Sequence, residues 1–283
     1  MALTVPSGHD LRDRYANLVL EKLRYTLVTK DHLIFNNRYE GDPKAGNVKV
    51  PVRDTEVAVR TYNRDEGIQV AGSATSYMDL PINVDIAVNE IIDGFDAAAV
   101  PDGIVAERLD SAGYAIALEL DDQGLGLLVD GGTQATDKSA STKANIMSQI
   151  VAVRTALGAA KVPVDGRYLI VSPKIMGLLL LSEEFIKAGD LSQELVAQGV
   201  VGRIAGFNVF ESNNIPETST GSLEVEFIAG HPNWSHRVYE WKVPPYVQSL
   251  DGDAAYIGAS AVKARLVYGQ KLSRATTVMV KVK

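Results

Sequence analysis

The segment from residue 101 to residue 130, PDGIVAERLDSAGYAIALELDDQGLGLLVD, determines how the chain is organised. Pro101 and Asp102 form a helix-start signal ahead of apolar residues that recur at helical steps. A helix of about 25 to 30 residues would span roughly 40 Å at 1.5 Å per residue, as long as a small domain. The segment therefore predicts one long helix with a buried face, on which other parts of the chain pack. The apolar positions are Val105, Leu109, Ala112, Ile116, Leu120 and Leu127.

The composition excludes several classes of protein. Of 283 residues, 46% are hydrophobic and 22% are charged, so the chain can bury a core in one large or two ordinary domains. Cysteine is absent, which excludes disulfides, thiolate metal sites and cysteine nucleophiles. No apolar run approaches the roughly 20 residues of a membrane span, and no signal peptide is evident. We therefore expect a cytoplasmic origin and no membrane partner.

Charge is unevenly distributed along the chain. The net charge of -7 argues against general nucleic-acid binding, because affinity for phosphates comes from clustered Lys and Arg. Residues 101–130 carry seven acids and one base, whereas residues 254–283 carry six bases and no acid. Two interpretations stay open: two separate solvated faces, or basic C-terminal strands that flank the acidic helix. In the second, Lys263, Arg265 and Arg274 would lie near the acids of the helix.

The sequence shows no motif for catalysis or for a cofactor. The four histidines have no metal-binding spacing, so we predict no metal site. No glycine-rich loop completes a nucleotide-binding motif, and the GxSxG, SxxK, HExxH and EF-hand patterns are absent. We therefore predict no catalytic residues and no cofactor. The alternative from another class is a cytoplasmic hydrolase, with carboxylates such as Asp121 and Asp190 as candidates.

An amphipathic arm is predicted near the N-terminus. Residues 11–35 place apolar side chains, including Leu18 and Leu23, at helical steps with mixed charges between them. Such a helix has one apolar face that needs a surface to cover it. We therefore expect Leu18 and Leu23 to contact a neighbouring molecule.

The next segment predicts a projecting β-hairpin. Valines at 48, 50 and 52 alternate with Lys49, Pro51 and Arg53, and after a polar break Val57 and Val59 alternate again. Proline and frequent charges favour an edge over a core, and an isolated hairpin is marginal in water. We therefore expect its partner surface on another molecule. The candidate interface residues are Arg53, Asp54, Glu56, Arg60 and Arg64.

A compact α/β subdomain is predicted from residue 131 onward. GGTQATDKSAST at 131–142 predicts a small-residue linker, 141–160 predicts a helix, and 164–181 predicts a buried strand followed by a Ser-Pro helix start. VVGRIAGFNVFESNNIP, LEVEFIAG and SHRVYEWKV then predict three β-rich pieces. The final strands, AVKARLVYG and TTVMVKV, are expected to lie outside this subdomain and beside the long helix.

The order of these segments carries a resemblance. TSYMDLPINVDIAVNEIIDGFDAAAVPD follows the hairpin, GRYLIVSP and VVGRIAGFNVFESNNIP lie in the α/β subdomain, and YIGASAVKARLVYGQ lies near the end. Over essentially the full length, this arrangement resembles the major capsid proteins of tailed bacteriophages, which have the Hong Kong 97 fold. Within that family, the sequence resembles the coat proteins of short-tailed enterobacterial phages and their relatives in other phages.

The resemblance implies an α+β fold with four parts. They are an N-terminal arm at 1–37, an extended β-hairpin loop at 38–80, a peripheral domain with a long spine helix at 81–130 and 251–283, and an axial α/β domain at 131–250. Pro101 to Asp130 would be the spine helix, with its glycines marking a bend or close packing.

The resemblance also implies a function. Copies of the chain would assemble as hexamers and pentamers into the icosahedral shell of a tailed bacteriophage, in the cytoplasm of the host bacterium. The shell would enclose double-stranded DNA without sequence-specific binding, and a portal and a separate scaffolding protein would be partners. The alternative with the same fold is an encapsulin-like nanocompartment, which encloses cargo protein instead of DNA.

Overall fold

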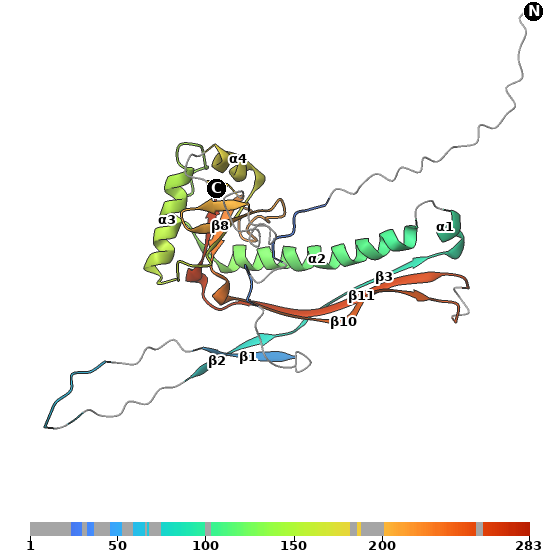
Figure 1. Ribbon diagram of the computed structural model, residues 1–283, viewed down its shortest axis with the longest axis horizontal. Helices are drawn as coiled ribbons and strands as arrows, with labels where there is room; N and C mark the ends of the chain where they lie inside the picture. Colours follow the sequence, from blue (N-terminus) through green and yellow to red (C-terminus); the bar gives the residue numbers. More distant parts are fainter. Residues whose placement is uncertain are drawn as a thin grey trace, which may run out of the picture.

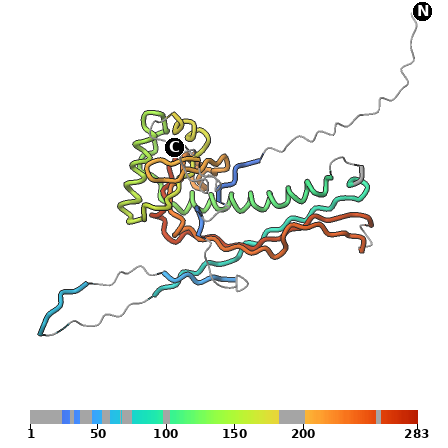
Figure 2. The backbone as a smooth tube through the Cα atoms, viewed as in Figure 1, coloured from blue at the N-terminus to red at the C-terminus, as the bar shows by residue number. Residues whose placement is uncertain are grey.

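The computed structural model describes residues 24–29, 33–36, 46–52, 59–65, 67, 75–99, 103–181, 186–187, 201–252 and 257–283. Three parts are evident in Figures 1 and 2: a long blade, a globular head at one end of it, and a hairpin that projects away from both. The blade is a long helix lying on a three-stranded sheet, and the head is built on a seven-stranded sheet.

Helix α2 (Ile104–Gly131) is the predicted long helix, and its 28 residues span about 42 Å at 1.5 Å per residue. Its N-terminal half packs Ala112 and Ile116 on the sheet of the blade. Its C-terminal half packs Leu125 and Leu128 against the sheet of the head. One helix therefore serves as a spine that joins the two parts (Figure 1).

The sheet of the blade lies under the spine helix. Its elements, with the short helix at its tip, are β3 (Val84–Ile92), α1 (Gly94–Ala99), β10 (Ser235–Ser249) and β11 (Ser260–Leu272). The strand order is β10-β11-β3, and both pairings are antiparallel. Alternate residues of β11, such as Val262, Ala264 and Leu266, are buried toward α2, as strand periodicity requires. The edge strand β10 has a register shift that spans Pro244 and Pro245, where an edge tolerates proline.

The head is a sheet covered on both faces. Its elements are β4 (Thr133–Gln134), α3 (Ile146–Ala159), β5 (Tyr168–Val171), α4 (Pro173–Leu180), β6 (Ile186–Lys187), β7 (Gly202–Ile204), β8 (Phe207–Glu211), β9 (Val225–Gly230), the 3-10 helices Pro232–Trp234 and Ala275–Thr277, and β12 (Val278–Val282). The strand order is β4-β12-β9-β5-β8-β7-β6. Helices α3 and α4 cover one face, and the C-terminal half of α2 with Ile34 and Phe35 covers the other.

Several predicted elements of the α/β subdomain are confirmed, and three expectations are wrong. The helix at α3, the buried strand β5 followed by α4, and the strands of the three β-rich pieces all form. The third piece, SHRVYEWKV, lies in β10, which belongs to the blade sheet and not to the head. The strand within TTVMVKV is β12, which pairs with β9 inside the head sheet and not outside the subdomain. All five of its residues are buried, so it needs cover on both faces. The expected linker at 131–142 contains β4 and residues that bind the head.

The predicted hairpin forms with a different second strand. Its strands are β1 (Asn47–Val52) and β2 (Ser76–Pro81), which pair antiparallel. The expected partner included Val57, which lies outside the described residues, and Val59, which is in no strand and is 99% exposed. Pairing with β2 places Val48 beside Leu80, and Leu80 is fully buried. Apolar side chains on a shared face therefore select β2 as the partner.

The described part of the arm is not helical. Residues 24–29 and 33–36, which we call the strap, run along the junction of blade and head, and Ile34 and Phe35 are buried in the core of the head. Asn36 continues onto β10, where its N–H donates to Ser235 O at 2.7 Å. The strap therefore packs on its own subunit. Side chains and a strand there accept hydrogen bonds from its backbone N–H groups, which a helix would satisfy internally.

Candidate assembly surfaces

A buried carboxylate fastens the strap to the spine helix. Asp121 of α2 is 1% exposed, and its Oδ1 accepts hydrogen bonds from Val28 N at 3.0 Å, Thr29 N at 2.8 Å and Thr29 Oγ1 at 2.8 Å. Its Oδ2 accepts from Asn214 Nδ2 at 3.2 Å, in the turn after β8. One side chain thus joins strap, spine and head. Both of its oxygens are occupied, which suits a structural role better than acid/base chemistry.

Arg237 of β10 is a buried cation in the same junction. Burial lowers its pKa to about 10, while the charge of Asp121 acts in the opposite direction. Its guanidinium donates to the carbonyl and, at 3.1 Å, to the hydroxyl of Thr29, and it lies 4.1 Å from the ring centroid of Phe35. A Cβ on Gly124 of α2 would lie 2.3 Å from Nη2 of Arg237. Close packing therefore explains this glycine of the spine helix.

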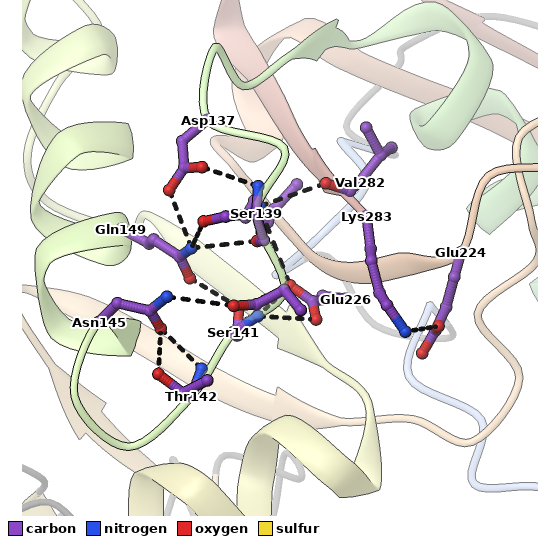
Figure 3. A network of polar contacts seen from close by, with 12 residues as sticks. Asp137, Ser139, Ser141, Thr142, Asn145, Gln149, Glu224, Glu226, Val282 and Lys283 are labelled. Carbon is purple, nitrogen blue, oxygen red and sulfur yellow. Dashed lines mark hydrogen bonds and ion pairs between the residues drawn. The ribbon is translucent and has the colours of Figure 1, made fainter.

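A second polar network holds the start of the head (Figure 3). Glu226 of β9 and Lys281 of β12 are each 1% exposed, with Nζ 4.0 Å from Oε2. Ser141 donates to Glu226 from its backbone N at 3.0 Å and from its Oγ at 2.6 Å, and Lys281 Nζ donates to Ser139 O at 2.6 Å. Hydrogen bonds from Ser139 lower the pKa of Asp137 to about 2. The segment expected to be a linker is therefore tied to the sheet.

The outer part of the hairpin loop exposes apolar and basic side chains together. Val59 is 99% exposed and Tyr62 is 65% exposed. The predicted interface residues Arg60 and Arg64 are exposed, and neither forms an ion pair with any residue that the structure describes. This surface has both apolar area and free charge to offer a partner. The other predicted interface residues lie outside the described residues: Arg53, Asp54, Glu56, Leu18 and Leu23.

The tip of the blade exposes an apolar pair that sequence reasoning missed. Phe95 of α1 is 79% exposed and Ile257 is 81% exposed. Their neighbours Gly94 and Gly258 touch, since a Cβ on Gly94 would lie 2.2 Å from Gly258 O. The two large side chains therefore flank one close contact at the end of the subunit. The only signal in the sequence is a glycine beside each large side chain, and the sequence does not reveal that these two glycines touch.

The sequence left open that basic C-terminal strands flank the acidic helix, but the bases of β11 do not. Arg265 Nε donates to Asp85 Oδ1 of β3 at 3.0 Å, which lowers the pKa of Asp85, and Lys263 Nζ donates to Gln248 Oε1 at 2.8 Å. The reason is strand alternation: Leu266 and its even-numbered neighbours face α2, so the odd-numbered bases face away from it. For Arg265 and Lys263, the expectation is wrong.

The described residues offer no metal centre. Among them, no group of three or more His, Asp and Glu side chains suits a metal ion, and no helix in that part of the chain is long and apolar enough to cross a membrane. Burial lowers the pKa of His231, and it lowers the pKa of His236 to about 4. His231 Nε2 bonds Asp165 O at 2.9 Å, and its Nδ1 accepts from Asn233 N. Both rings therefore pack as neutral groups.

The spine helix, projecting hairpin and two sheets define the Hong Kong 97-like class of phage capsid folds. A structure from Mycobacterium phage Che8 is 22% identical in sequence with a TM-score of 0.71, and the match covers 97% of each chain. The capsid of Cyanophage P-SCSP1u is 14% identical with a TM-score of 0.71, covering 95% of this chain and 92% of that chain. The mature capsid of bacteriophage PhiM1 is 13% identical with a TM-score of 0.69, covering 95% and 91%.

The family of phage capsid proteins matches residues 84–280, well over half of the chain. The chain therefore belongs to this family, and it is a major capsid protein that forms a phage shell. No curated protein matches the sequence. The predicted α+β fold and capsid function are confirmed, and the encapsulin-like and hydrolase alternatives are not favoured.

Proposed function

We propose that copies of this chain form an icosahedral shell of hexamers and pentamers, joined in part by the hairpin loop. The observation that carries the proposal is the exposed loop surface of Val59, Tyr62, Arg60 and Arg64. A two-stranded hairpin is marginal by itself in water, and large exposed apolar side chains favour a partner surface. A neighbouring copy would bury the apolar side chains and supply carboxylates to the arginines.

The proposal assigns a role to each part of the chain. Residues 1–37 act as the N-terminal arm, 38–80 as the extended loop, 81–130 with 251–283 as the peripheral domain, and 131–250 as the axial domain. In the loop, arginines and acids form ion pairs between subunits, and in the arm two leucines pack on a neighbour. The residues concerned are Arg53, Asp54, Glu56, Arg60, Arg64, Leu18 and Leu23.

The proposal also names what the shell encloses and what helps to build it. The shell assembles in the cytoplasm of the host bacterium and encloses double-stranded DNA, with a portal and a separate scaffolding protein as partners. The net charge of -7 favours enclosure without sequence-specific binding, because strong phosphate affinity needs clustered bases. The chain acts as a structural protein and not as an enzyme. Asp121, the described hydrolase candidate, supports this because hydrogen bonds occupy both of its oxygens, while Asp190 lies outside the described residues.

Shortening the loop tests the proposal. Val52 and Ser76 are register partners, so an Asn-Gly turn in place of residues 53–75 would close the hairpin and remove only its outer part. We expect a folded subunit by circular dichroism that forms no shells under negative-stain microscopy. Closed shells with normal yield would refute the role of the loop. A second variant replaces Arg60 and Arg64 with Glu and so changes the charge of the loop without changing its length. Lys143→Glu on the head is its control.

Nuclease-resistant nucleic acid in purified particles tests the proposed cargo. Particles from infected cells should protect long double-stranded DNA, measured after nuclease treatment and extraction. Particles filled with a single protein species, without DNA, would support a nanocompartment and contradict the proposal.

A further inference from the structure

We propose that Gly269 of β11 is a positioning residue, whose missing side chain sets the direction in which the hairpin leaves the blade. The inference rests on the proposed role of the hairpin in assembly. It starts from alternation along β11: Leu266 and Tyr268 pack in the cluster under the spine helix. Gly269 and Lys271 therefore face the opposite side of the sheet.

That opposite side is where the hairpin crosses the blade. The last pairing between β11 and β3 joins Tyr268 to Val84, so at Gly269 the chain leading to β3 is no longer in the plane of the sheet. Strand β2 instead lies over this face of β11. A Cβ on Gly269 would lie 2.1 Å from Pro81 O, 3.0 Å from Pro81 C and 3.2 Å from the Cα of Ile82.

Two hydrogen bonds and one buried side chain complete the site on which the base of the hairpin rests. We call this site the seat and define it as Gly269 and Lys271 of β11 with residues 79–82. Lys271 Nζ donates to Asp79 O at 2.9 Å. Leu80 is fully buried, and Ile82 N donates to Gly46 O at 3.0 Å, which closes the base of the hairpin. The hairpin is thus held at its base by contacts on one face of β11, while the described loop residues 59–65 lie away from the blade and the head (Figure 1).

The seat leaves no room for a side chain. The atoms that a Cβ on Gly269 would meet belong to the backbone of Pro81 and Ile82, which cannot rotate away as the end of a flexible side chain can. At about 3.4 Å between successive residues, residues 79–81 span about 7 Å and the six-residue strand β2 about 17 Å. A tilt that displaces one end of residues 79–81 by roughly 1 Å relative to the other would therefore move the far end of β2 by roughly 2.5 Å. Closely packed interfaces do not tolerate a displacement of that size.

The cysteine-free chain allows this displacement to be measured directly. Tyr77→Cys on the hairpin and Arg154→Cys on α3 are both exposed positions for nitroxide labels, whose separation is measured by pulsed electron resonance. The background is the subunit with the loop shortened to Asn-Gly, which keeps β1 and β2 but should not assemble. We expect Gly269→Ala to shift or broaden the distance by about 2 Å, because Tyr77 lies four residues from Pro81 along β2. The matched control is Gly177→Ala, because a Cβ on Gly177 meets nothing within 4 Å.

Assembly of the full-length chain supplies the second readout. We expect Gly269→Ala to retain its circular dichroism and thermal transition but to lose closed shells, whereas Gly177→Ala assembles normally. If Gly269→Ala does not fold, Lys271→Met removes the bond to Asp79 O without adding an atom to the seat, and it should broaden the label distance and reduce shell yield. An unchanged label distance, or normal shells from either seat variant, would overturn the inference. Normal shells from the loop-shortened chain would instead refute the proposed function of the loop.

Discussion

Replacing Asp121 with Ala tests the junction of strap, spine and head. The substitution removes the acceptor for the N–H groups of Val28 and Thr29, the hydroxyl of Thr29 and the amide of Asn214. The hydroxyl and the amide can rotate to other acceptors, but the two backbone N–H groups cannot, and each buried unsatisfied donor costs about 1–3 kcal/mol. The buried Arg237 also loses its nearby counter-charge. We therefore expect a loss of about 4 kcal/mol, a large share of the roughly 5–15 kcal/mol that stabilises a domain.

The neighbouring acid provides the control. Asp122 is exposed; partial desolvation and the charges of Glu119 and Asp121 raise its pKa, but it holds no other segment that the structure describes in place. Asp122→Ala should therefore change stability by less than about 0.5 kcal/mol. Both variants are made in the loop-shortened subunit, and urea unfolding is followed by circular dichroism at pH 7. Hydrogen exchange should show that the amides of Val28 and Thr29 lose protection only in Asp121→Ala. Equal unfolding midpoints for the two variants would refute the reasoning.

Three further outcomes are expected. Burial lowers the pKa of His236 from 6.5 to about 4, so the unfolded state binds a proton that the folded state does not. Stability should fall by roughly 1.4 kcal/mol per pH unit from 6.5 toward 4, and His236→Gln should flatten that slope in urea titrations; an unchanged slope would contradict it. Serines at Phe95 and Ile257 should barely change subunit unfolding but weaken assembly, because each side chain buried at a contact contributes about 1.5–3 kcal/mol; unchanged assembly would show that the tip faces solvent. Lys281→Met should destabilise by about 3–5 kcal/mol by leaving Glu226 charged and unpaired, and adding Glu226→Gln should recover part of the loss, so additive effects would argue against the pair.

Local periodicity was enough to predict the main helices and the buried strands of the head. The spine helix α2 and helix α3 repeat apolar residues at helical steps, and Pro173 after Ser172 marks the start of α4. These signals depend only on neighbouring residues, so they can be recognised in a single sequence.

Pairing between distant segments was not predictable in the same way. The alternation in β1 predicts a strand but does not identify β2 as its partner, and β12 has the same pattern whether it lies inside or outside the head. The position of the strap was unpredictable for the same reason, because Thr29 N donates to an acceptor 92 residues further along the chain. The exposed Arg60 and Arg64 were predictable from charge on a projecting loop, whereas the pair Phe95 and Ile257 required the contact between two glycines.

Electron cryo-microscopy of particles formed by the full-length chain tests the central claim most directly. The account predicts closed shells of sixfold and fivefold capsomers, in which the loop around Tyr62 and Arg64 lies in density contact with a neighbouring copy. Particles whose loops project into solvent, or a chain that stays monomeric by light scattering under assembly conditions, would contradict it.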